Sequence, residues 1–294
     1  GGGRGRPEVE VAAALRGAHP TAQLEFVNQR VIPNAIEPRS AIGHYDDARD
    51  HFTLYTTSQN PHLTRLLLCA FVLGIPEHKV RVVAPDVGGG FGSKIFHYAE
   101  EALMIWVSQR LKRPVKWTSD RSEAFMTDAH GRDHITTAEM GFDQDGQIVA
   151  LRATTLANLG AYLSTFGPAV PTYLHGTLMQ GLYTTPKVNV DVTGVFTHTT
   201  PVDAYRGAGR PEATYLLARL LDTAALEMGM DPAELRLKNF IPPFDGVEQP
   251  GYQTQVALQY DSGNYHGVLE KALEMVDYKK FRKEQEAARR EGKL

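Results

Sequence analysis

A glycine-rich segment at residues 86–94, DVGGGFGSK, is the first part of the sequence whose residue types could do chemistry. Glycine lacks a Cβ, so backbone N–H groups in such a loop can turn toward a bound group. The loop follows an expected strand at 79–84 and leads into an expected helix at 98–112, whose N-terminus would favour an anion or an electron-rich oxygen. It is not a P-loop, because Ile95 replaces the magnesium-binding Ser or Thr, and it departs from the dinucleotide fingerprint, because Ser93 takes the third glycine position. A ligand-binding loop and a plain tight turn both remain open.

Two polar segments could add side-chain donors. Residues 56–61, TTSQNP, place Gln59 at the end of a strand and before a proline-started helix, where its amide could enter a cleft. A capping or loop role is the alternative for Gln59. Residues 203–210, DAYRGAGR, place Arg206 among small residues, so that its guanidinium could donate a fixed fork of hydrogen bonds into a site. An arginine paired with a surface carboxylate is the alternative there.

Composition excludes several other classes of protein. The 294 residues carry 31 Lys and Arg against 34 Asp and Glu, and this net charge of -3 does not favour a nucleic-acid partner. The single cysteine, Cys69, is expected in the core, because one thiol can form neither an internal disulfide nor the roughly four ligands of an iron–sulfur cluster. The histidines lack metal-ligand spacing, so no protein-ligated metal site is expected. No Gly-x-Ser-x-Gly occurs, so a serine hydrolase is unsupported.

No membrane segment is expected, because the longest apolar run, residues 66–74, is far shorter than the ~20 residues that span a bilayer. Residues 1–22 are interpreted as a disordered lead-in or a cut edge, and the location is expected to be cytoplasmic. A charged, exposed helix is expected at the other end, over residues 277–294.

Strands and helices interleave along the chain, which favours an α+β fold of mixed sheets with packed helices. Strands are expected at 23–32, 51–57, 79–84, 115–119, 133–142, 148–158 and 188–198. Helices are expected at 61–73, 98–112 and 210–228, with a further helix after Asp231. The apolar face of the 210–228 helix consists of Leu216, Leu217, Leu220, Leu221 and Ala224.

The segments TTSQN, DVGGGFGSK and VDAYRGAGR, in this order and spacing, closely resemble the large subunit of the molybdenum hydroxylases. This family includes xanthine dehydrogenase, aldehyde oxidoreductase and aerobic carbon monoxide dehydrogenase. Flanking segments at 26–39 and 258–263 also resemble it, so the resemblance runs from about residue 24 to residue 276. The AYRGAGR motif is similar to that of the carbon monoxide dehydrogenase-like branch.

This resemblance implies a molybdopterin cofactor, in bacterial relatives usually its cytosine dinucleotide, whose molybdenum is held by the pterin dithiolene. Gln59 would hydrogen-bond the apical oxo ligand, and Arg206 would lie beside the metal. The backbone of Gly89, Gly90, Phe91 and Gly92 would line the molybdenum and the pterin. The three loops are therefore expected to converge on one concavity. Iron–sulfur and FAD cofactors are expected in partner subunits.

The resemblance also places a substrate pocket. Ile95 stands where purine-oxidising relatives carry a glutamate, Leu174 where they carry a substrate arginine, and Ala208 where they carry a stacking aromatic. Gly207 follows the motif arginine, where carbon monoxide dehydrogenases carry the cysteine that binds copper. These departures argue against purine and carbon monoxide oxidation, and they favour a small carbonyl or heteroaromatic substrate oxidised with water as the oxygen source.

The family's subunit is more than twice as long, and its general-base glutamate, in a later Gly-Glu segment, has no counterpart in this sequence. Residues 23–276 are accordingly expected to form the first half of a molybdopterin-binding domain pair. The expected partners are an iron–sulfur subunit, an FAD subunit and a chain that supplies the C-terminal cofactor domain. A non-catalytic fragment or assembly module is the alternative, and a nucleotide-dependent dehydrogenase is disfavoured by the failed fingerprint.

Overall fold

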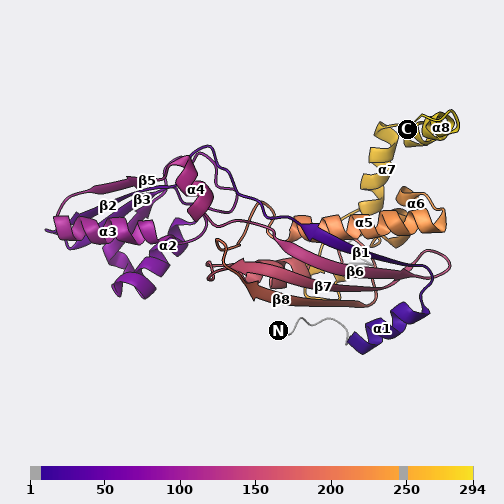
Figure 1. Cartoon of the computed structure of the whole chain (residues 1–294), viewed down its shortest axis with the longest axis horizontal. Coiled ribbons are helices and arrows are strands. Elements are labelled where there is room, and N and C mark those ends of the chain that lie inside the picture. The colour runs from indigo at the N-terminus through magenta and orange to yellow at the C-terminus, as the bar shows by residue number, and fades with distance from the viewer. Residues whose placement is uncertain (1–7, 245–250, 294) are drawn as a thin grey trace.

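The computed structural model describes residues 8–244 and 251–293 and has two lobes, each built on a four-stranded sheet (Figure 1). The small lobe contains strands β2 (Ser40–Asp46), β3 (His51–Thr56), β4 (Val80–Val83) and β5 (Val115–Thr118), and helices α2 (Pro61–Leu67), α3 (Ala99–Leu111) and α4 (Arg121–Thr127). The large lobe contains strands β1 (Thr21–Asn28), β6 (His134–Phe142), β7 (Ile148–Gly160) and β8 (Val188–Phe196), and helices α1 (Glu8–Gly17), α5 (Arg210–Met228) and α6 (Pro232–Asn239). The expected α+β class with mixed sheets is confirmed.

The small-lobe sheet has the order β4-β3-β2-β5, with β3 and β4 parallel and the other pairs antiparallel. Helix α3 packs on this sheet at unusually close range, because a Cβ at Gly43 of β2 would overlap the backbone of Met104. Leu54, Ile105 and Cys69 are buried between the sheet and its helices, so Cys69 is a core residue as expected.

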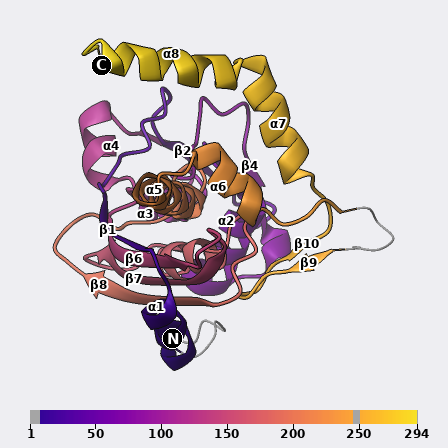
Figure 2. The same ribbon diagram turned by 90° about the vertical axis from the view of Figure 1, so that its right-hand side faces the viewer.

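The large-lobe sheet has the order β1-β6-β7-β8, antiparallel except for β7 and β8. Figure 2 shows α5 on one side of this sheet and α1 on the other. The expected apolar face of α5 is confirmed, since these residues are all buried against the sheet: Leu216, Leu217, Leu220, Leu221 and Ala224. Helix α5 ends at Gly229, whose φ of 64° is the left-handed conformation that favours glycine.

Two parts of the fold differ from the expectations. A disordered lead-in over residues 1–22 is wrong for residues 8–17, which form α1 and bury Val11 and Leu15. Strand β2 and helix α4 were not expected. The helix expected after the glycine-rich loop, over residues 98–112, is confirmed, because α3 begins at Ala99 and ends at Leu111.

The last helices, α7 (Tyr265–Met275) and α8 (Tyr278–Arg290), project away from the large-lobe sheet (Figures 1 and 2). A short pair of strands, β9 (Tyr252–Gln253) and β10 (Gln259–Tyr260), precedes them. Helix α8 has no buried residue and occupies most of the expected charged tail, 277–294, whose boundary remains a prediction. Within the described ranges, every helix is too short or too polar to cross a membrane.

Candidate functional site

The three predicted segments meet between the two lobes. The Gly92 amide donates to Gln59 Oε1 at 2.9 Å, and the Gln59 amide donates to the Lys94 carbonyl at 2.8 Å. From the large lobe, the Arg206 amide donates to the Phe91 carbonyl at 2.9 Å. The structure therefore brings Gln59, the glycine-rich loop and Arg206 together, although the role of each residue remains a prediction.

Close packing requires glycine at positions 90 and 92 of the loop. A Cβ at Gly90 would overlap the side-chain amide of Gln59, and a Cβ at Gly92 would overlap the Ala204 carbonyl group. Gly92 also has a φ of 104°, which side chains rarely adopt. Phe91 between them has a φ of 53°, a strained conformation for a bulky residue. The local sequence is thus dictated by close packing against the two other segments.

Several hydrogen-bond donors at this junction have no protein acceptor. In the described part of the chain, the Gln59 Nε2 and the backbone amides of Gly90 and Phe91 make no hydrogen bond. The exposed Arg206 guanidinium forms no ion pair with any described carboxylate, and its nearest recorded partner is the Phe91 ring, with Cζ 5.9 Å from the ring centroid. An amide, a guanidinium and backbone N–H groups suit an oxygen-rich, negatively charged ligand.

Lys94 and Glu37 hold the first end of the loop. The Lys94 ammonium, with a side chain only 1% exposed, donates to the Glu37 carbonyl and to Glu37 Oε2, both at 2.8 Å. The same carboxylate oxygen accepts from the Gly88 amide at 2.7 Å. Burial raises the pKa of the Glu37 carboxyl, but the hydrogen bonds from Lys94 and Gly88 outweigh it, so the pKa lies below its usual value. Glu37 is thus a stable carboxylate that anchors the loop.

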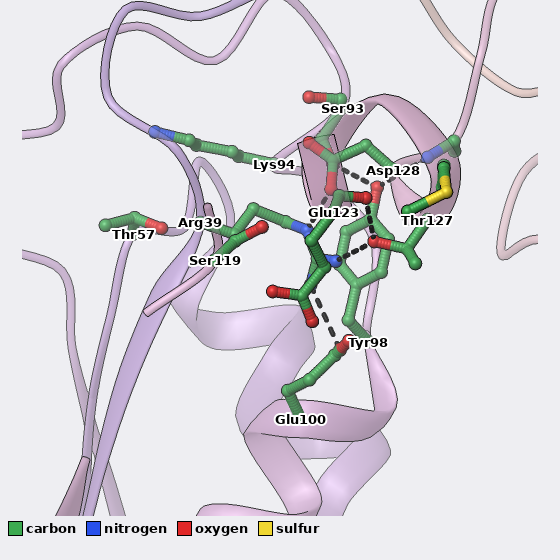
Figure 3. A network of polar contacts seen from close by, with 12 residues as sticks. Arg39, Thr57, Ser93, Lys94, Tyr98, Glu100, Ser119, Glu123, Thr127 and Asp128 are labelled. Atoms are coloured by element: carbon green, nitrogen blue, oxygen red, sulfur yellow. Dashed lines mark hydrogen bonds and ion pairs between the residues drawn. The ribbon is translucent and has the colours of Figure 1, made fainter. Parts of the chain in front are cut away.

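Arg39 is the centre of a buried polar network behind the other end of the loop (Figure 3). Its guanidinium donates to Asp128 Oδ1 at 2.6 Å and to Glu100 Oε2 at 3.1 Å, and its Cζ lies 3.6 Å from the centroid of the Tyr98 ring. Burial lowers the pKa of Arg39, but the two carboxylates outweigh it and raise the pKa. The network joins the segment before β2, helix α3 and the end of α4.

Tyr98 transmits this network to the loop. Its hydroxyl donates to the Ser93 carbonyl at 2.7 Å and accepts from the Ala129 amide at 3.1 Å. Burial raises the pKa of the Tyr98 hydroxyl, so it stays protonated and keeps its donor. The roles of this tyrosine, of Arg39 and of Lys94 could not be predicted from the sequence, because their partners are distant along the chain.

The predicted pocket residues lie next to the junction. Ile95, Leu174 and Ala208 are half-buried around one apolar cluster. The buried members of this cluster are Phe96, Ala129, Val170 and Ala204. Gly207 is exposed, with a φ of 100°, and a Cβ there would stand 2.7 Å from the Pro211 ring. The structure thus places an apolar wall beside the unpartnered donors.

We next consider whether protein side chains could bind a metal ion directly. No group of three or more His, Cys, Asp or Glu side chains in residues 8–244 and 251–293 is arranged to hold a metal ion. The donors at the junction would instead contact the oxygen atoms of a ligand.

Comparison with known proteins gives the family. Residues 4–240 match the molybdopterin cofactor-binding domain. The chain is 39% identical to the carbon monoxide dehydrogenase large chain of Hydrogenophaga pseudoflava over 94% of its own length and 34% of that protein. It matches the solved structure of quinoline 2-oxidoreductase from Pseudomonas putida 86 with a TM-score of 0.90 at 31% identity, covering 99% of this chain and 36% of the other.

A reconstituted CO dehydrogenase from Oligotropha carboxidovorans matches with a TM-score of 0.88 at 34% identity, covering 98% of this chain and 36% of the other. The chain therefore spans about a third of the length of these relatives. The matched region includes the glycine-rich loop, Gln59 and Arg206. The chain belongs to the molybdopterin cofactor-binding domain family found in the large subunits of the molybdenum hydroxylases.

Proposed function

We propose that this chain is the cofactor-binding part of a molybdenum-dependent hydroxylase that oxidises a substrate C–H bond with water as the source of oxygen. The reaction balances as R–H + H2O → R–OH + 2 e− + 2 H+. The observation that carries the proposal is the convergence of Gln59, Phe91 and Arg206 at one junction, with donors that have no acceptor in the described part of the chain.

The donor set fits a molybdopterin, whose phosphates and metal-bound oxygens are acceptors. The group supplies the two-electron redox chemistry when bound. Gln59 Nε2, the Arg206 guanidinium and the amides of Gly90 and Phe91 would hold these oxygens, and the glycine loop would admit the pterin at close range. The Gln59 amide is held by its hydrogen bond from the Gly92 amide, and the backbone of Arg206 by its hydrogen bond to the Phe91 carbonyl, so these segments can stabilise developing negative charge with little rearrangement. We propose the cytosine dinucleotide form of the cofactor.

The substrate that we propose is a small carbonyl compound or a heteroaromatic. The half-buried wall of Ile95, Leu174 and Ala208 offers apolar contacts. It contains no charged side chain that could bind the polar atoms of a purine. The relative named quinoline 2-oxidoreductase supports a heteroaromatic substrate. Carbon monoxide is disfavoured, because Gly207 provides no thiolate for copper and the Pro211 ring blocks a side chain at this position.

Electron transfer and proton removal would need other protein parts. We propose that an iron–sulfur subunit and an FAD subunit accept the electrons, and that a C-terminal cofactor domain, on another segment or chain, supplies the general-base glutamate. General base catalysis contributes typically ~10²- to 10⁴-fold, so the 294 residues alone should turn over weakly at best.

An isotope experiment tests this function. The complex purified with its partner subunits is incubated in ¹⁸O-labelled water with quinoline, benzaldehyde or carbon monoxide and a dye as electron acceptor. We expect one ¹⁸O atom per product from quinoline, at least one from benzaldehyde because its carbonyl oxygen itself exchanges with water, one molybdenum per complex, and a loss of turnover in Arg206→Ala. A complex without molybdenum would refute the proposal and leave an assembly module as the function.

A further inference from the structure

Among the described residues, no hydrogen bond or ion pair fixes the direction of the Arg206 side chain. The guanidinium is exposed. Its Cζ lies 5.9 Å from the centroid of the Phe91 ring, which is close to the upper limit for a cation–π contact. Its backbone is better fixed, because the amide donates to the Phe91 carbonyl. The turn at residues 204–209 therefore sets where the guanidinium can reach.

The Arg132 side chain binds the backbone of this turn. Its Nη1 donates to the Tyr205 carbonyl at 2.9 Å and its Nη2 donates to the Arg206 carbonyl at 2.8 Å. One planar fork thus spans two successive carbonyls, a pattern that the single ammonium of a lysine does not reproduce. The Arg132 Cζ also lies 4.8 Å from the Tyr205 ring centroid. Arg132 therefore contacts both the backbone of the turn and the Tyr205 side chain.

Glu212 supports the fork from the first turn of α5. Its side chain is fully buried, and Oε1 lies 3.4 Å from Arg132 Nη1, while Oε2 has no partner among the described residues. Burial raises the pKa of Glu212, and the charge of Arg132 opposes this rise. Since a lone buried carboxylate is unfavourable, Arg132 and Glu212 depend on each other.

The backbone at Arg132 is strained in a way that supports a functional role. Arg132 and Asp133 have φ angles of 65° and 67°, so two successive non-glycine residues adopt the left-handed region. Such strain persists only where the surrounding contacts impose it, and it concentrates at functional sites. Gly131 just before them touches Tyr205, and a Cβ there would stand 3.1 Å from its Cγ.

We propose that Arg132, supported by Glu212, is a positioning residue that directs the Arg206 guanidinium toward the bound cofactor. This inference rests on the proposed function. It assigns to Arg132 no contact with cofactor or substrate, so its whole effect must pass through Arg206.

A double-mutant cycle in the complete holoenzyme tests this proposal. The variants are Arg132→Lys, which keeps the charge but not the fork, Arg206→Ala, and their combination. The readouts are molybdenum content, the molybdenum electron paramagnetic resonance spectrum after dithionite reduction, and turnover of quinoline or benzaldehyde with a dye acceptor. We expect Arg132→Lys to retain molybdenum, to change the spectrum and to lower turnover on the order of 10-fold or more. In the Arg206→Ala background, the same substitution should change neither spectrum nor turnover further.

Two controls make the outcomes decisive. Arg152→Met removes an ion pair with Glu139 on the same sheet, away from the turn, and should leave spectrum and turnover unchanged. If Arg132→Lys does not assemble, Glu212→Gln, which keeps the shape of the side chain, should give the same but weaker changes through Arg206. A wild-type spectrum in Arg132→Lys, or effects of Arg132→Lys and Arg206→Ala that multiply, would overturn the inference. An unaltered Arg206→Ala enzyme would instead refute the proposed role of Arg206 itself.

Discussion

Replacing Gly90 by alanine should weaken cofactor binding at the junction much more than it lowers the stability of the small lobe. The added Cβ would stand 2.7 Å from Gln59 Cγ and closer still to Cδ and Oε1, whereas nonbonded carbons need roughly 3.5 Å. Gly90 does not have a positive φ, so the backbone itself accepts alanine. The exposed Gln59 side chain must therefore move away, and its hydrogen bond with the Gly92 amide must break.

The change should affect the free energy of unfolding and the free energy of cofactor binding by different amounts. Loss of one hydrogen bond between neutral groups costs about 1 kcal/mol of unfolding free energy. Loss of the Gln59 donor to a charged ligand costs about 1.5 to 3 kcal/mol of binding free energy, which is roughly a 10- to 100-fold weaker affinity for the cofactor. We thus expect a small effect on folding and a larger effect on cofactor retention.

The assays are urea unfolding and molybdenum retention after dialysis. Both tryptophans, Trp106 on α3 and Trp117 on β5, lie in the small lobe, so their fluorescence reports the lobe that carries the loop. Gly176→Ala is a matched control, because its nearest neighbour to an added Cβ is 3.8 Å away. The double variant Gly90→Ala with Gln59→Ala should retain no less cofactor than Gln59→Ala alone. If the two losses add instead, the steric explanation is incorrect.

Three further predictions concern the residues around the site. Lys94→Met should lower the urea midpoint and cofactor retention, with a cost of about 1.5 to 3 kcal/mol, because it removes the two hydrogen bonds from the Lys94 ammonium to Glu37; an unchanged midpoint would contradict the anchoring role. Tyr98→Phe keeps the ring stacked on its arginine but loses two hydrogen bonds, so we expect about 1 to 3 kcal/mol of destabilisation by urea unfolding. Burial lowers the pKa of His134 to about 4, so stability should fall as pH drops from about 6.5 to 4, and His134 alone should account for about 3 kcal/mol of the fall at most, since the unfolded chain binds the proton first. His134→Gln should flatten that dependence without removing it, because the adjacent His175 is buried too and has a pKa of about 3.

Regular elements could be predicted where hydrophobic periodicity was strong. The helix expected over residues 210–228 matches α5, and the strands on either side of the turn at residues 143–146 match β6 and β7 closely. Strand β2 was missed because Gly43 interrupts its apolar alternation, and that glycine is what allows α3 to approach. Helix α1 was missed because only Val11 and Leu15 are buried among charged and small residues.

The site could be predicted in part for a related reason. Glycines with positive φ or close contacts leave a signature within one segment, so the loop around Gly90 was visible in the sequence. Ion pairs leave no such signature, because Arg39 and Asp128 are 89 positions apart and Lys94 and Glu37 are 57 apart. No period relates such partners, and only the folded chain brings them together.

The two kinds of contact at the junction suggest how one cofactor site can serve different substrates. The backbone segments that carry the donors are joined by main-chain hydrogen bonds, such as that from the Arg206 amide to the Phe91 carbonyl, which do not depend on the identity of either side chain. The apolar wall, in contrast, consists of the side chains of Ile95, Leu174 and Ala208. A substitution in the wall should therefore alter which substrate is oxidised while leaving cofactor retention intact. A substitution that adds a Cβ to the glycine loop should do the reverse, because it shifts the donors and leaves the wall in place.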